Sequence, residues 1–313
     1  MIFDLPDTTT AKVSKSLVNI REEGGAVALG RVLTLVIATE PGHEEEAIAA
    51  ANEASREHPM RVIVLSIPHE RTNITNRLDA EIRVGGDAGA SEVIILRACG
   101  EVGGDERGLV NGLLLPDTPV VAWWPTESPT VVSQSALGEM AQCRITDAAG
   151  SADPVSRLTE LSTTYAPGDA DFAWTRITGW RTQLAAVLDQ PPHEPITAIE
   201  IACSSDSPSG QLLAAWLSLR LGVQVDMHVS HSEPVDGPIH RVILTRSSGD
   251  IVLKRLNDKV ARLEQPGQPT HDVSLTRRSL RDCLAEELRR LDPDIVYGDV
   301  ITQGLALLPH ASS

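Results

Sequence analysis

Two nearly continuous apolar stretches decide the fold class of this chain. They are Arg-Val-Leu-Thr-Leu-Val-Ile-Ala-Thr at residues 31–39 and Arg-Val-Ile-Val-Leu-Ser-Ile at residues 61–67. Such runs are typical of strands that are buried on both faces of a parallel sheet. Between them, Pro41-Gly42 turns the chain, and residues 43–57 begin with three glutamates, which favour the N-terminus of a helix. The order strand, helix, strand predicts an α/β fold with a doubly wound, mostly parallel sheet.

The same alternation extends through the first half of the chain. A helix is predicted over residues 8–21 with Asp7 as its N-cap, and residues 78–84 alternate apolar and polar side chains as an edge strand would. Residues 150–169 are rich in Asp, Pro, Ser, Thr and Gly, which indicates a linker or a partly helical connection. We therefore expect an N-terminal α/β domain over residues 1–165. Its further strands are predicted at residues 92–96 and 119–124.

The second half begins with another α/β unit and then changes its period. A strand at 196–203, a helix at 211–221 and a strand at 223–229 are followed by apolar and polar alternation around Ser247-Ser248-Gly249. That alternation around a glycine turn predicts a β-hairpin, which residues 259–264 and 271–275 extend. The expected C-terminal domain, residues 166–313, is thus α/β with an antiparallel meander. A helix over residues 280–291 closes it.

Composition limits the classes of function. The chain has 313 residues and a formal net charge of −16, which disfavours nucleic acids and anionic membranes as partners. No apolar run approaches the roughly 20 residues of a membrane span, and residues 1–7 lack the regions of a secretory signal. The four cysteines are widely spaced, without the pairing typical of zinc sites. We expect a cytoplasmic protein with reduced thiols and no bound metal.

No short motif predicts catalysis or a nucleotide cofactor. The glycine-rich fingerprints of dinucleotide and P-loop sites are missing, as is the GxSxG elbow of hydrolases. The glycine clusters at 85–89 and 100–104 indicate turns, and His228 and His231 lack a third metal ligand. We therefore expect neither an enzyme nor a bound cofactor.

The loop between the strand at 196–203 and the following helix is the best candidate for a small ligand. Hydroxyls and backbone amides at a helix N-terminus can bind a phosphate group. The alternative is ordinary N-capping by the same side chains. The candidate phosphate-binding residues are Ser204, Ser205, Ser207, Ser209 and Gly210.

Four of the five tryptophans fall within one 58-residue stretch. Tryptophan and arginine are the residue types that most often anchor protein interfaces. The alternative is that the rings belong to the core, with those at 174 and 180 on one face of a single helix over residues 172–188. The candidate partner-binding residues are Trp123, Trp124, Trp174, Arg176, Trp180 and Arg181.

Four ordered motifs resemble one known family. They are Leu-Pro-Asp-Thr-Thr-Thr at residues 5–10, the stretch from Arg21 to Leu35, Thr-Pro-Val-Val-Ala-Trp-Trp-Pro at 118–125, and Trp-Thr-Arg-Ile-Thr-Gly-Trp-Arg at 174–181. Together they are similar to the glucose-6-phosphate dehydrogenase assembly protein family, OpcA, over nearly the whole chain.

The resemblance implies a function that the residues alone do not. It implies a non-catalytic assembly factor and allosteric activator of glucose-6-phosphate dehydrogenase, which would support the oxidative pentose phosphate pathway and the supply of NADPH. It transfers no catalytic residues, and because the cysteines here are scattered, it does not carry over the redox regulation known for some relatives. The alternative is a sugar-phosphate-binding protein or enzyme that uses the loop from Ser204 to Gly210.

Overall fold

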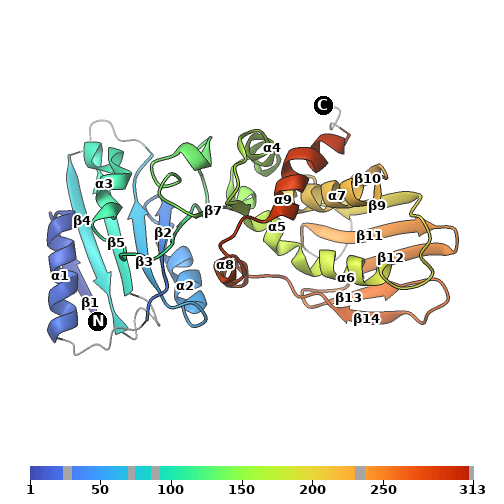
Figure 1. Ribbon diagram of the computed structural model, residues 1–313, viewed down its shortest axis with the longest axis horizontal. Helices are drawn as coiled ribbons and strands as arrows, with labels where there is room; N and C mark the ends of the chain where they lie inside the picture. The colour runs from blue at the N-terminus through green and yellow to red at the C-terminus, as the bar shows by residue number, and fades with distance from the viewer. Residues whose placement is uncertain (24–29, 70–74, 86–91, 230–236, 310–313) are drawn as a thin grey trace. The chain divides into compact units, whose positions relative to one another are not determined.

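The computed structural model describes residues 1–23, 30–69, 75–85, 92–229 and 237–309. These residues form an eight-stranded sheet and a six-stranded sheet, each in its own compact unit (Figure 1). The predicted α/β class with two sheets is confirmed. Unit 1 comprises Met1–Asp147, Gly168–Ala170 and Ser279–Pro293, and unit 2 comprises Ala148–Pro167, Asp171–Arg278 and Asp294–Ser313.

The sheet of unit 1 is doubly wound, as predicted. Its strands lie in the order β1-β4-β5-β3-β2-β6-β7-β8, and β5, β3, β2, β6 and β7 run parallel. The chain winds from β2 through β3 to β5 on one side and through β6 to β7 on the other, so the winding reverses between β2 and β6. The strands are β1 (Ile2–Leu5), β2 (Leu33–Thr39), β3 (Met60–Ser66), β4 (Arg77–Arg83), β5 (Glu92–Cys99), β6 (Val120–Trp123), β7 (Cys143–Thr146) and β8 (Asp169–Asp171).

The N-terminal segment corrects two expectations. β4 is not an edge strand, because the short strand β1 pairs antiparallel with its outer side. The helix at the start, α1 (Thr10–Glu23), begins later than predicted and is capped by Thr9, whose hydroxyl accepts a hydrogen bond from Lys12 N. Asp7 is not the cap, since its backbone N donates to the carboxylate of Asp79 and so ties the chain to β4.

Unit 1 includes a helix from near the C-terminus. α8 (Leu280–Arg289) lies beside α2 (Glu44–Ala54), where Arg281 Nε is 3.7 Å from Glu53 Oε2. A capping box, in which Ser279 and Asp282 bond reciprocally, starts α8. The compact units are therefore interleaved along the chain, and the division into two domains at residue 165 stays a prediction.

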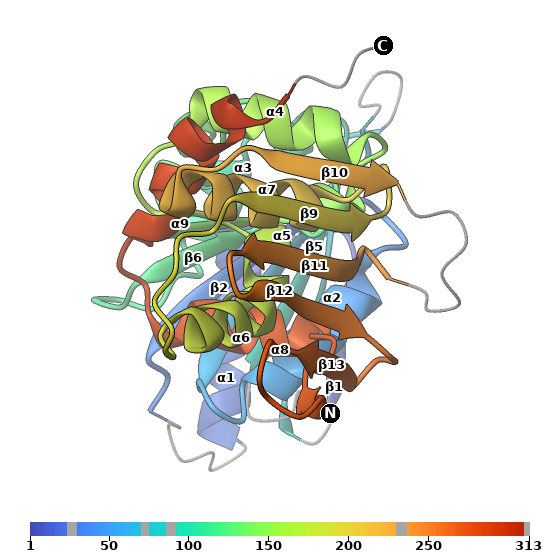
Figure 2. The ribbon, with the colours of Figure 1, turned by 90° about the vertical axis from the view of Figure 1, so that its right-hand side faces the viewer.

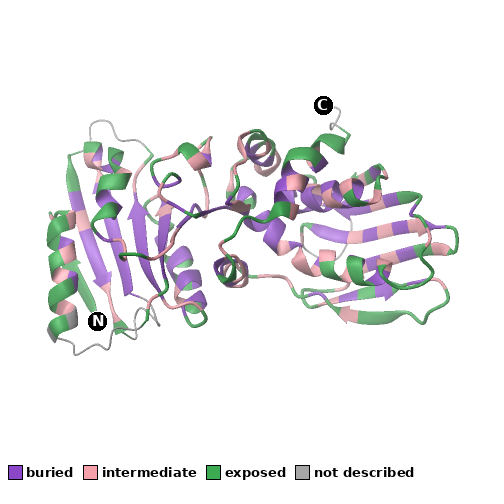
Figure 3. Cartoon of the chain, viewed as in Figure 1, coloured by how far each residue is buried: buried purple, intermediate pink, exposed green. Residues whose placement is uncertain are grey.

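The sheet of unit 2 has the predicted antiparallel meander. β9 and β10 are parallel and the remaining pairs are antiparallel, in the order β10-β9-β11-β12-β13-β14 (Figure 1; β10 to β13 also in Figure 2). Along β11 and β12, buried and half-buried side chains alternate, so one face of the sheet is packed and the other is open (Figure 3). The strands are β9 (Ala198–Cys203), β10 (Val225–Val229), β11 (Ile239–Arg246), β12 (Gly249–Arg255), β13 (Val260–Glu264) and β14 (His271–Ser274).

The helices of unit 2 correct the predicted helix over residues 172–188. It is two helices that meet at Ile177, whose φ of −93° and ψ of 5° interrupt the regular geometry. The segment 150–169, expected as a linker or partly helical connection, contains an 11-residue helix. The helices are α4 (Pro154–Thr164), α5 (Phe172–Arg176), α6 (Thr178–Leu188), α7 (Pro208–Leu221) and α9 (Ile295–Asp299).

Glu44 differs from its neighbours in the first turn of α2. Its side chain is buried, and its carboxylate accepts hydrogen bonds from Gly42 N and Ser66 Oγ, both at 2.7 Å. Burial raises the pKa of Glu44, but these hydrogen bonds outweigh it, and the net effect lowers the pKa. Glu44 thus does more than favour the start of the helix, because it also joins α2 to the end of β3.

We predict that Glu44→Gln lowers the free energy of unfolding at pH 7 by about 1–2 kcal/mol, since it weakens hydrogen bonds to a buried charge. A lowered folded-state pKa stabilises the protein above the unfolded-state pKa and ceases to do so as pH falls through the folded value. The difference between wild type and Glu44→Gln should therefore shrink below about pH 4.5. Denaturant titrations across pH measure it, with the exposed Glu46→Gln as control. Equal effects of both substitutions would contradict the assignment.

Candidate functional site

The four clustered tryptophans are buried. Their exposed fractions are 0% for Trp123, 4% for Trp124, 3% for Trp174 and 3% for Trp180. Packing against the sheets and helices leaves almost no ring surface free, as the alternative of core tryptophans implies. Whether any of the six predicted residues touches a partner in a complex stays a prediction.

Two of the predicted partner residues contact each other. The guanidinium carbon of Arg181 lies 3.6 Å from the ring centroid of Trp174, a cation–π stack. The indole Nε1 of Trp174 donates to Asp294 Oδ2 at 2.9 Å, and the ring of Tyr297 lies 5.8 Å away. The conspicuous Trp–Arg pattern at residues 174–181 thus holds α5 and α6 to the start of α9.

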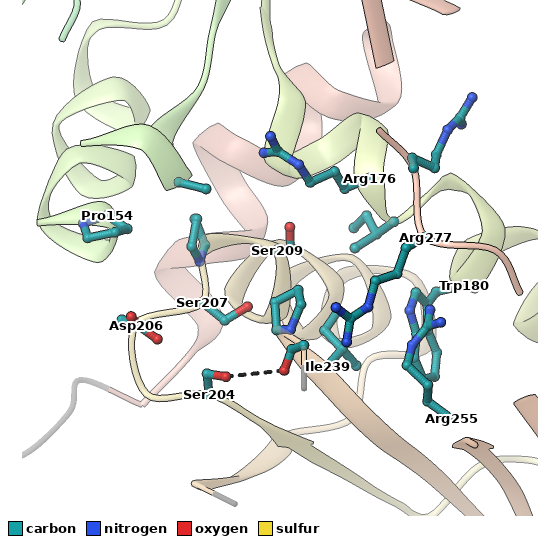
Figure 4. A pocket seen from close by; sticks show the side chains of 16 residues that line it. Pro154, Arg176, Trp180, Ser204, Asp206, Ser207, Ser209, Ile239, Arg255 and Arg277 are labelled. Atoms are coloured by element: carbon teal, nitrogen blue, oxygen red, sulfur yellow. Dashed lines mark hydrogen bonds between the residues drawn. The ribbon is translucent and has the colours of Figure 1, made fainter. Parts of the chain in front are cut away.

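Trp180 and Arg176 instead line a pocket of about 500 Å³ in unit 2 (Figure 4). The predicted loop residues Ser204, Ser207 and Ser209 line the same pocket. The structure therefore brings candidate partner-binding residues and candidate phosphate-binding residues together in one pocket. The remaining walls are Ala149, Pro154, Ile177, Asp206, Pro208, Gly237, Pro238, Ile239, Arg255, Arg277 and Arg278.

The loop hydroxyls are largely engaged within the fold. Ser207 caps α7 by accepting from Gly210 N at 2.9 Å, and Ser209 Oγ donates to Ala173 O at 2.9 Å. Ser204 Oγ donates to Gly237 O at 3.2 Å, while Ser205 is exposed outside the pocket lining. Ser207 thus provides the N-cap stated as the alternative for this loop, while Ser204 and Ser209 bond to neighbouring segments.

Packing explains why a glycine stands at position 210. A Cβ at this position would lie 2.9 Å from Cys203 Sγ, so a side chain there would push α7 away from β9. Gly210 is not part of the pocket lining. We therefore assign it to helix–strand packing.

Three arginines that the sequence analysis did not select give the pocket its charge. Arg255 ends β12, and Arg277 and Arg278 follow β14. With Arg176 they place four guanidinium groups in the lining, against the one carboxylate of Asp206. In the sequence, the signal that could have pointed to these residues was the adjacent pair Arg277-Arg278, which follows the last strand of an acidic chain.

The side chain of Arg255 is held rigidly. It is 6% exposed, its Nη1 donates to Asn257 O and Leu275 O, and its guanidinium lies 5.4 Å from the ring centroid of Trp180. Burial and then the nearby charge of Arg277 lower the pKa of Arg255. Arginine nevertheless stays protonated in proteins. The two cations therefore repel each other inside the pocket.

Unit 1 has a second pocket, of about 480 Å³, at the carboxyl ends of β2, β3 and β6. This is the crevice where doubly wound sheets bind ligands. Trp124 lines it, but so do Glu40, Glu106 and Glu127. The carboxylate of Glu44 also occupies the N-terminus of α2, the usual place of a pyrophosphate in dinucleotide-binding folds. These negative charges disfavour an anionic dinucleotide in the crevice.

The other candidate groups give no second site. Burial raises the pKa of Cys143 to about 12 and that of Cys203 to about 11, so neither thiol is poised to react. His228 pairs with Asp226 at 3.4 Å, while His231 and residues 86–89 lie outside the described residues. Within those residues, no group of three His, Cys, Asp or Glu side chains could hold a metal ion.

Within the described ranges, no helix has both the length and the apolar character needed to cross a membrane.

We predict that Trp123→Ala lowers the free energy of unfolding by about 3–5 kcal/mol, as expected for deleting a fully buried aromatic ring. Trp123→Phe should cost clearly less, because most of the apolar volume remains. Urea denaturation followed by circular dichroism measures both variants. Unchanged stability of Trp123→Ala would show that the ring does not support the core.

Both halves of the chain are similar to known proteins. No curated protein matches the sequence. KijD10, a 3-ketoreductase from Actinomadura kijaniata, has a similar structure with a TM-score of 0.48 and 10% sequence identity, over 88% of this chain and 95% of that one. Residues 51–163 match the model of the glucose-6-phosphate dehydrogenase subunit N-terminal domain, and residues 167–301 match that of the C-terminal domain. The chain therefore belongs to the OpcA family of glucose-6-phosphate dehydrogenase assembly proteins.

Proposed function

We propose that this protein is a non-catalytic partner of glucose-6-phosphate dehydrogenase that promotes assembly of the active enzyme and raises its activity. The observation that carries the proposal is the family match, which extends through both halves of the chain and names subunit domains of that dehydrogenase. The role would increase NADPH production by the oxidative pentose phosphate pathway.

Activation by a partner requires differential binding. A protein shifts an equilibrium between two states only by its difference in affinity for them. A coupling free energy of roughly 1–3 kcal/mol gives a population shift of about 5- to 150-fold. We propose that this chain binds the active oligomer of the dehydrogenase more tightly than its inactive form.

The open face of the unit 2 sheet is the surface that best suits this contact. At its centre, Ile243 on β11 lies opposite Val252 on β12, and both side chains are half-buried. Two residues along the same strands, Arg241 lies opposite Lys254. An apolar centre with charged neighbours is typical of protein interfaces. Because the tryptophans are buried, we place the contact with the dehydrogenase on this face.

The first prediction for this function is a saturable rise in NADPH production when the chain is added to the dehydrogenase of the same organism. Initial rates at limiting and saturating glucose 6-phosphate separate an effect on KM from one on kcat. The chain alone should produce no NADPH. An unchanged rate at every ratio of the two proteins would contradict the proposal.

A second prediction locates the contact. Ile243→Glu and, separately, Arg241→Glu should increase the concentration of chain needed for half-maximal activation by about tenfold or more, the effect of losing roughly 1.4 kcal/mol of binding free energy. The matched control is Val18→Glu, at a position on α1 that is 48% exposed. Thermal unfolding checks that all three variants fold. If Val18→Glu alone impairs activation, the contact lies on unit 1.

A further inference from the structure

We propose that the arginine-lined pocket of unit 2 binds a small organic phosphate ester. The proposal concerns the chain by itself and does not depend on its association with the dehydrogenase. It also differs from a phosphate site built on the serine loop, because the arginines supply the charge.

Arginine side chains from separate elements gather around this pocket. Arg176, Arg255 and Arg277 come from α5, the end of β12 and the segment after β14, and Figure 4 shows their side chains around one hollow. The whole chain carries a net charge of −16, so a local excess of positive charge is not a consequence of composition. Guanidinium groups bind phosphate oxygens through paired hydrogen bonds.

Arg255 and Arg277 are held by contacts that offset little of their charge. Arg277 Nε lies 3.1 Å from Asp258 Oδ1, a carboxylate that is largely exposed. Its Nη2 is buried without a hydrogen-bond partner among the described residues. Arg255 donates to backbone carbonyls, which carry no full charge. A bound anion would relieve the repulsion between Arg255 and Arg277.

The backbone is shaped to keep this arrangement. Gly237 has a φ of +146°, and a Cβ on it would collide with the guanidinium of Arg277. The N-terminus of α7, a 14-residue helix, reaches the same pocket through Ser207 and Ser209. Its partial positive charge adds to that of the arginines.

The size and the apolar walls of the pocket suit an organic ligand. A volume of about 500 Å³ lies within the range of small-molecule sites and exceeds what a bare phosphate fills. Ile177, Trp180 and Ile239 provide apolar surface beside the charged groups. A ligand with an organic body and a phosphate group matches both parts of the lining.

The test is titration calorimetry on the full chain. The probes are glucose 6-phosphate, 6-phosphogluconate, inorganic phosphate and uncharged glucose. We expect saturable binding of at least one phosphate ester, weaker binding of inorganic phosphate and none of glucose. Inorganic phosphate that binds as tightly as both esters would overturn the assignment of an ester, and no heat with any phosphate compound would overturn the site.

Variants decide whether the heat comes from this pocket. Arg277→Gln should weaken binding of the ester about tenfold or more, because it removes a charge-assisted contact. The matched control, Arg262→Gln, removes an exposed arginine of β13 that pairs with Asp272 outside the pocket, and it should leave binding unchanged. Equal binding by Arg277→Gln and wild type would overturn the proposal.

A second substitution guards against an indirect effect on folding. Arg176→Gln changes a different element of the same pocket, and it should also weaken binding while thermal unfolding stays cooperative. Because binding is measured without the dehydrogenase, a negative result here leaves the activation assay untouched. Activation without ligand binding, or ligand binding without activation, would separate the two proposals.

Discussion

Burial of both faces of the parallel strands is the constraint on which the rest of unit 1 depends. β2 and β3 have almost no exposed side chain, so helices must cover the sheet on both sides. α8, which comes from the C-terminal part of the chain, packs beside α2 in this unit. The compact unit is therefore completed by a segment that begins at Leu280, far along the chain from β7, which ends at Thr146.

The same need to satisfy buried groups explains how the conspicuous residues are used. Trp174 is stacked by Arg181 and hydrogen-bonded by Asp294, and Ser207 caps α7. Glu44 joins α2 to β3. In each case a side chain that is chemically capable of recognition is already engaged in a contact within the fold. The groups best suited to recognition are those whose charge is only partly offset by contacts within the fold. The clearest case is Arg277 in the pocket of unit 2.

The two units differ in the charge that they offer at their pockets. The crevice of unit 1 lies where a doubly wound sheet usually binds a nucleotide, yet three glutamates line it. The pocket of unit 2 has four arginines and one aspartate. If unit 2 binds a phosphate ester, a chain that assists the dehydrogenase would also respond to a metabolite, and its affinity for the enzyme could be coupled to that metabolite by linkage.

The sequence by itself determined the fold class, since runs such as residues 31–39 and 61–67 require a sheet buried on both faces, and the alternation after residue 240 requires a half-exposed meander. It also determined the family, through long ordered motifs. It did not determine the break at Ile177 or the exposure of the tryptophans, because a Trp–Arg pattern has the same spacing in a core as on a surface. Only the tertiary structure brought Arg176 together with Arg255 and Arg277. These residues lie up to about a hundred positions apart, and a pocket forms where packed elements leave space, which no local pattern records.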